Sequence, residues 1–252
     1  MAAALSYREF WTLHAARSTT VKYRRTYFGP LWIVFGFAIF VFTVGWLFSD
    51  LLGWRAQRFL PHFAVGLMCW TFISSVVVAG SRSYLSGRQF LLSMRLPPPM
   101  FSLSFIYSEA IETAHLTVVA IPVVLLFGFY PDTSWLLLLP AVAIYAITAV
   151  FTSTLLSVIT LRFRDVGEFM SAIMRFMFFL TPIIWDLEES SHLEKYINWN
   201  PFYHYIEMVR DPLLNRPVDP LNWIVTGAVT LALGAAASAV YGASRSRLTY
   251  WI

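Results

Sequence analysis

Six long apolar segments constrain this chain more than any other feature. A helix of about 20 apolar residues is long enough to cross a bilayer, and the charges of this chain lie mostly between such segments. Only 13% of the 252 residues are charged, against about 25% in a typical soluble domain. The sequence therefore predicts an all-α integral membrane protein with six transmembrane helices. The predicted spans are residues 30–48, 63–80, 99–130, 135–161, 169–185 and 223–241.

The lysines and arginines are distributed unevenly between the two sets of loops. Twelve of the 18 lie in the N-terminal segment, the second and fourth loops and the C-terminal tail, while five lie in the other loops and Arg175 lies within a span. Because Lys and Arg favour the cytoplasmic side of a membrane, we expect both termini in the cytoplasm. The basic residues then reflect topology and inner-leaflet lipids, and they indicate no nucleic-acid partner.

Two segments outside the spans are also predicted to be helical. Residues 1–28 predict an amphipathic interface helix at the inner membrane surface, because Tyr7, Phe10, Trp11 and His14 share one helical face. For residues 186–220 we expect interfacial or re-entrant helices on the periplasmic side, between spans five and six. The helical spacing in this segment involves Tyr196, Trp199, Tyr203, Ile206 and Val209.

The sequence contains no motif for nucleotide binding or hydrolysis. It has no G-x-x-x-x-G-K-[ST] phosphate loop, no H-E-x-x-H and no G-x-S-x-G. Its five histidines are scattered without ligand-like spacing. We therefore expect no catalytic residue, no metal site and no cofactor on this chain. Any transport must then draw its energy from an ion gradient or from a partner.

Four stretches carry a resemblance to a known family. "VKYRRTYFGPLW", "LRFRDVGEF", "FFLTPIIW" and "NWNPFYHYIEMVRDPLL" occur in this order along the chain. Together they resemble ABC-2 type transporter permeases that export polysaccharides such as O-antigen, capsule or teichoic-acid precursors. "LRFRDVGEF" would form the cytoplasmic turn between spans four and five, and the last stretch looks most like the O-antigen branch.

The resemblance implies partners and a division of labour. Such a permease is a homodimer in the bacterial inner membrane, bound to two copies of a cytoplasmic ATP-binding subunit that holds ATP and Mg. Its substrate would be a lipid-linked O-antigen polysaccharide, with capsule or teichoic-acid precursors as alternatives. The chain would form a single permease domain, residues 1–252. It would comprise the interface helix (1–28), spans one to five (29–185), periplasmic gate helices (186–220), and span six with the tail (221–252).

Aromatic residues mark candidate channel walls. Together with Ile39, those of the first span recur every three or four residues and so form one stripe. Such a stripe serves equally well as a packing seam or an interfacial belt, but flat rings would also let the apolar C–H faces of sugars slide past. Similar permeases imply the second role, with span five supplying a facing wall. The candidate lining residues are Phe28, Trp32, Phe35, Phe42, Trp46, Phe169, Phe176 and Phe179.

Ionisable residues within the spans form a second candidate group. Glu109, Glu112 and His115 follow one another at intervals of three residues in span three. Because charges are costly in hydrocarbon, we expect them to face protein or water, in a structural network that Arg175 would close. Proton coupling by the two glutamates is the functional alternative.

The remaining candidates follow from the resemblance. The second loop and the N-terminal helix would couple the permease to the ATPase through Arg82, Tyr84, Arg88, Arg95, Arg8 and Arg17. An aromatic and polar patch in the outer loop would form a periplasmic gate. The gate candidates are Tyr196, Trp199, Asn200, Tyr203 and His204.

Two functions of other classes stay open at this point. A proton-coupled secondary transporter would use Glu109 and Glu112 as carriers, although the sequence shows no pair of Gly/Pro-broken spans at matching positions. A non-transporting scaffold would only recruit enzymes of glycan synthesis to the membrane.

Overall fold

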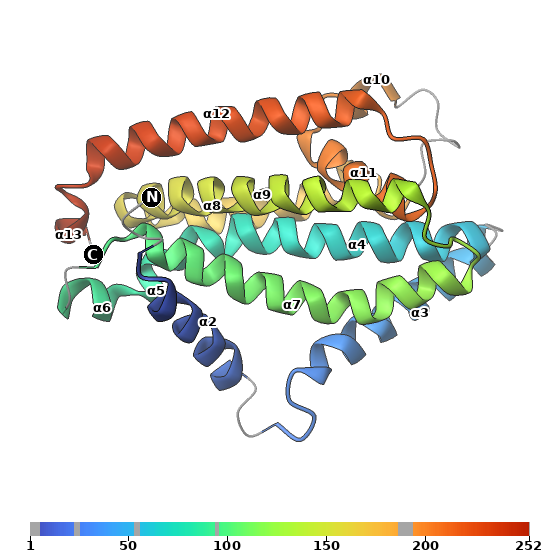
Figure 1. The fold of residues 1–252 in the computed structure, drawn as a ribbon, viewed down its shortest axis with the longest axis horizontal. Coiled ribbons are helices and arrows are strands. Elements are labelled where there is room, and N and C mark those ends of the chain that lie inside the picture. The colour runs from blue at the N-terminus through green and yellow to red at the C-terminus, as the bar shows by residue number, and fades with distance from the viewer. Residues whose placement is uncertain (1–5, 23–25, 53–55, 94–95, 186–193, 252) are drawn as a thin grey trace.

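The chain folds as an elongated helical bundle. The computed structural model describes residues 6–22, 26–52, 56–93, 96–185 and 194–251, and within these ranges it contains helices and no strands (Figure 1). The predicted all-α class is confirmed. Five helical segments are long and apolar enough to cross a membrane. They are Leu31–Phe48, Gln57–Ser93, Pro99–Leu126, Thr133–Arg162 and Pro220–Ser244.

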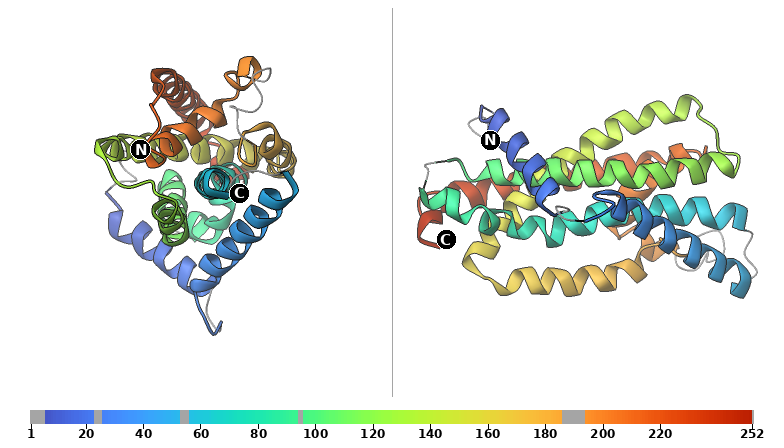
Figure 2. Two further views of the ribbon diagram at one scale, coloured as in Figure 1. Left: turned by 90° about the vertical axis from the view of Figure 1, so that its right-hand side faces the viewer. Right: turned by 90° about the horizontal axis from the view of Figure 1, so that it is seen from below.

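Helix α4 (Ala56–Val78) occupies the centre of the bundle, as the end-on view in Figure 2 shows. Phe63, Ala64 and Val65 are fully buried. Helix α4 contacts most of the other long elements, which makes it the common support of the fold. The helices packed against it are α3 (Leu31–Leu52), α7 (Pro99–Leu126), α8 (Leu138–Arg162) and α9 (Asp165–Leu180). Helix α12 (Pro220–Ser244) packs mainly on α8.

Helix α9 differs from the predicted fifth span, residues 169–185. It begins four residues earlier, at Asp165, and ends at Leu180, because Thr181 precedes Pro182 and takes an extended backbone (φ −98°, ψ 135°). Its 16 residues measure roughly 24 Å, less than the hydrocarbon core of about 30 Å. The six-span count therefore stays a prediction.

The N-terminal segment forms helix α2 (Arg8–Lys22), which packs on α7. His14 Nδ1 lies 2.9 Å from Ser104 Oγ, and Ser18 Oγ lies 3.3 Å from Ser108 Oγ. Gly29 adopts a positive φ of 55° in the turn that leads into α3, a conformation that glycine tolerates best.

Short helices connect α4 to α7. They are η1 (Gly80–Arg82), α5 (Ser83–Ser86) and α6 (Arg88–Ser93). The Gly80 carbonyl accepts hydrogen bonds from Ser153 and Ser157 of α8, at 3.0 and 2.8 Å. These bonds anchor the C-terminal end of α4 to α8. Figure 1 shows α5, α6, the α8–α9 turn and α13 (Leu248–Trp251) together at one end of the bundle.

The segment after α9 forms two helices rather than one continuous face. The short α10 (Glu194–Ile197) and α11 (Pro201–Leu213) are separated by residues 198–200, and η2 (Thr133–Leu137) packs against α11. Tyr196 and Trp199 are exposed, whereas Ile206 and Val209 are buried. The prediction that these residues share one helical face is therefore wrong. Helix α11 lies inside the bundle, against α4, α8 and α12.

Candidate transport surface

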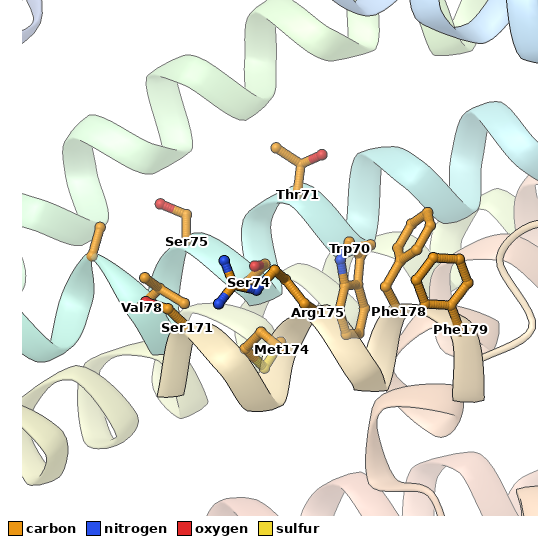
Figure 3. Close-up of a pocket in the computed structure, with 11 residues that line it drawn as sticks. Trp70, Thr71, Ser74, Ser75, Val78, Ser171, Met174, Arg175, Phe178 and Phe179 are labelled. Atoms are coloured by element: carbon orange, nitrogen blue, oxygen red, sulfur yellow. The ribbon is translucent and has the colours of Figure 1, made fainter. Parts of the chain in front are cut away.

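An open groove of about 700 Å³ runs between α4 and α9 (Figure 3). One wall comes from α4 and the other from α9, because these two helices pack side by side. The groove combines aromatic rings, hydroxyl groups and one arginine. Its lining includes Trp70, Thr71, Ser74, Ser75 and Val78 from α4, and Ser171, Met174, Arg175, Phe178 and Phe179 from α9.

The predicted aromatic stripe of the first span faces outward. The opposite face of α3 holds Phe37, Val41 and Gly45, which are buried. Helix α3 therefore has one packed face and one exposed aromatic face. Phe28, Trp32 and Phe35 touch one another edge to face, with ring centroids 5.5 to 6.4 Å apart. All five residues are between 43% and 71% exposed: Phe28, Trp32, Phe35, Phe42 and Trp46.

Helix α9 exposes the second aromatic row. Phe169, Phe176 and Phe179 are 60% to 73% exposed. Both α3 and α9 pack on α4, and in the end-on view they flank the same side of it (Figure 2). A single chain therefore does not enclose a passage between the two rows. They face a second copy, lipid or substrate.

A second pocket, of about 730 Å³, continues from this groove toward α10 and α11. Phe179 lines both pockets. The second pocket also contacts the predicted gate residues Tyr196, Trp199 and Asn200. Trp199 is 87% exposed. The aromatic surface is thus continuous from the middle of α9 to the predicted gate.

Asn200 joins two of the sequence motifs. Its Oδ1 accepts from the Phe202 N–H at 3.0 Å, which caps the start of α11. Its Nδ2 donates to Thr181 Oγ1 at 2.8 Å, which fixes the end of α9. One amide side chain therefore holds "FFLTPIIW" against "NWNPFYH".

These two bonds predict different results for two substitutions. Asn200→Asp keeps the capping oxygen but loses the donor to Thr181, whereas Asn200→Ala loses both. We expect Asn200→Ala to destabilise the protein by about 1–2 kcal/mol and Asn200→Asp by roughly half as much. Thermal unfolding of the purified protein in detergent measures both. Equal destabilisation by the two variants would show that the cap contributes nothing.

The other two gate candidates are more enclosed than expected. His204 is fully buried, with Nε2 3.0 Å from the Asn198 carbonyl and Nδ1 2.7 Å from Asn222 Oδ1. Its prediction as an accessible gate residue is therefore corrected, because it ties the turn before α11 to α12. Tyr203 is half-buried, and burial raises the pKa of its phenol, so it stays a neutral donor.

Buried charges on α11 were missed by the sequence analysis. Arg210 Nη1 donates to Glu207 Oε1 at 2.6 Å, and the Arg210 side chain is 0% exposed. It lies against Gly66 of α4, where any Cβ would collide with the guanidinium. Burial, and next the Glu207 carboxylate, raise the pKa of Asp211 to about 8. The signal was present as three charges within "EMVRD", at the spacing of one helical face.

The structure does not assemble the expected four-residue polar network. Glu109 and Glu112 line a pocket of about 360 Å³ with His14 of α2. Arg175 instead lies in the α4–α9 groove, and His115 Nδ1 lies 2.7 Å from the Ile111 carbonyl of its own helix. Arg175 therefore does not close a network with the glutamates, because the two groups line different pockets.

The predicted coupling residues fall into three groups. Arg8, Arg17, Arg82 and Arg88 are exposed. Arg95 lies outside the described residues. Tyr84 is fully buried in a cluster with Met100 and Phe101, so its prediction as an ATPase contact is corrected.

The Arg82 side chain links the coupling segment to α9. Its Nη2 pairs with Glu168 Oε1 at 2.7 Å, and its guanidinium packs on Gly167, where a Cβ would come within 2.9 Å of Nε. "LRFRDVGEF" therefore contacts the α4–α7 connection through both residues. In the described ranges, no three His, Cys, Asp or Glu side chains are grouped to hold a metal ion.

Comparison with known proteins identifies the family. A Klebsiella pneumoniae protein named O-antigen export system permease protein RfbA is 25% identical over 199 residues, which cover 77% of this chain and 76% of that protein. A Myxococcus xanthus protein of the same name is 23% identical over 237 residues, covering 91% and 90%. The family model for ABC-2 type transporters matches residues 9–214. This chain, with its membrane-spanning helices, therefore belongs to the ABC-2 type transporter family.

Proposed function

We propose that this chain is the channel-forming permease subunit of an ATP-driven exporter that moves lipid-linked O-antigen polysaccharide across the bacterial inner membrane. The observation that carries the proposal is the pair of exposed aromatic rows on α3 and α9, the second of which reaches the pocket at the predicted gate through Phe179. Aromatic faces contact the apolar C–H faces of sugars without holding them by strong hydrogen bonds. The names of the relatives support O-antigen as the polysaccharide.

The proposed exporter contains two copies of this chain. The aromatic rows lie on the outside of one chain, and a twofold axis beside them would turn two such surfaces toward each other. ATP and Mg would be held by two copies of a separate cytoplasmic subunit, since the sequence has no phosphate loop.

The distribution of basic residues supports the proposed orientation. Arg82, Arg88 and Arg162 belong to elements at one end of the bundle, together with α13 (Figure 1). Helices α10 and α11 lie toward the other end. Because Lys and Arg favour the cytoplasmic side, we place the first end in the cytoplasm with both termini, and the second in the periplasm.

Deletion and complementation test the proposed function. Removing this chain from its bacterium should abolish O-antigen at the cell surface, and the plasmid-borne chain should restore it. Restoration should fail when the phosphate-binding lysine of the ATPase subunit is replaced, although the complex still purifies intact. Export that persists with the inactive ATPase, and stops with a proton uncoupler while ATP stays high, would contradict the proposal and favour a proton-coupled transporter.

A further inference from the structure

With α9 taken as the predicted fifth span, Arg175 lies where an arginine is costly. It follows the first residue of α9, Asp165, by ten positions, which is roughly 15 Å along the helix axis. That is about half the thickness of a hydrocarbon core. At such depth a charged side chain faces protein, water or a counter-ion rather than lipid. Arg175 is exposed in the single chain.

The groove around Arg175 offers hydrogen-bond donors and no negative charge. Among the described residues Arg175 forms no ion pair, and no aspartate or glutamate lines the groove. The hydroxyls of Ser74 and Ser75 form no hydrogen bond within the described part of the chain. Figure 3 shows the Arg175 side chain extending from α9 toward α4, with Ser74 beside it in this view and Ser75 farther from α9; all three line the groove.

The other two hydroxyl groups of the groove already donate hydrogen bonds within their own helices. Thr71 and Ser171 each donate to the carbonyl four residues earlier in their own helices, at 2.7 and 3.0 Å. The guanidinium and two serine hydroxyls thus form a donor set with room in front of it. Such a set suits an anion with several oxygens, and a guanidinium binds phosphate oxygens in a two-pronged geometry.

We propose that Arg175, Ser74 and Ser75 form a binding subsite for the phosphate ester of a membrane-embedded carrier lipid. This proposal rests on the proposed function, since the carrier lipid is the one that bears the exported glycan. The groove opens to the side of a single chain, so an amphiphile can enter it from the membrane. Trp70, Phe178 and Phe179 line the same groove and would contact the apolar parts of the same ligand.

Binding of farnesyl diphosphate, a short polyprenyl diphosphate without sugar, tests this subsite. The full chain is purified in detergent, and titration calorimetry measures the affinity. We expect Arg175→Gln to weaken binding roughly tenfold to a hundredfold, because a charge-assisted contact is lost. Arg175→Lys keeps the positive charge but loses the two-pronged guanidinium geometry. Its affinity should therefore fall between those of the unaltered chain and Arg175→Gln. Arg164→Gln, which removes an exposed arginine from the α8–α9 turn, is the matched control and should bind like the unaltered chain.

Competition distinguishes the sources of phosphate. Farnesol, which lacks phosphate, should not displace the diphosphate, and phosphatidylglycerol at equal mole fraction should displace little of it. Strong displacement by phosphatidylglycerol would assign the subsite to ordinary phospholipid and overturn its assignment to the carrier.

Two further results would overturn the subsite itself. One is unchanged affinity of a well-folded Arg175→Gln chain. The other is absence of diphosphate binding by the unaltered chain together with dissociation of the Arg175→Gln dimer. Arg175 would then pair with a carboxylate of the second copy. Binding requires neither ATPase nor glycan. Lost binding in Arg175→Gln, together with failure of the unaltered chain to restore surface O-antigen in the deletion strain, would therefore refute the proposed function and leave the subsite standing.

Discussion

Replacing Arg210 by methionine is expected to destabilise the protein by about 3–5 kcal/mol, because it leaves the Glu207 carboxylate buried without its cation. Methionine fills much of the same space, so the effect reports charge more than volume. For a chain of this size the midpoint of thermal unfolding should fall by on the order of 10 °C. Tryptophan fluorescence of the purified protein in detergent follows the transition.

The double substitution Glu207→Gln with Arg210→Met is the matched control. It removes both charges, so it should recover much of the stability lost by Arg210→Met alone. If the single and double variants unfold at the same temperature, the loss comes from packing and the ion pair contributes nothing.

Glycine substitutions probe the same contact from α4. Gly66→Ala would place a Cβ against the Arg210 guanidinium, whereas Gly227→Ala adds a methyl group where nothing lies within 4 Å. Arg210 thus fills a notch in α4, and α4 also forms one wall of the groove. Through this contact α11 is fixed to the helix that carries the candidate transport surface.

Prolines mark the breaks of the fold, although the predicted fifth span, residues 169–185, ran through Pro182. Pro182 ends α9, Pro201 starts α11 and Pro99 starts α7, each because proline restricts the residue before it or suits a first helical turn. The apolar lengths of the long spans were likewise sufficient to locate the five long helical segments.

Burial of particular polar residues was not predictable from the same pattern. Helical spacing shows which residues share a face, but not which helix covers that face. Tyr84 lies in a segment with exposed neighbours and is buried by α7, whereas His204 lies in a largely buried helix and contacts Asn222 of α12. Arg175 was predicted to join the glutamates of α7, but it lines a different pocket from them. Positions along the sequence do not show on which side of α4 each of these side chains lies.

The shared face of the α3 aromatic residues followed from spacing, whereas its outward direction came from the structure. Its role as a channel wall is the second large prediction. Trp32→Ala with Phe35→Ala should reduce surface O-antigen roughly tenfold, since ring contacts with substrate contribute about 0.5–1.5 kcal/mol each. Thermal stability should change little, because the two side chains are 51% and 44% exposed. Immunoblotting of surface glycan and unfolding of the purified protein measure the two effects separately.

Phe37→Ala on the same helix is the control with the opposite profile. Phe37 is only 8% exposed and packs in the core, so its truncation should cost about 3–5 kcal/mol. It should lower the amount of folded protein, and export should fall only in proportion to that amount. Normal surface glycan with the doubly substituted stripe would refute the channel wall. It would leave these rings as contacts to lipid, because their exposure in a single chain is compatible with either environment.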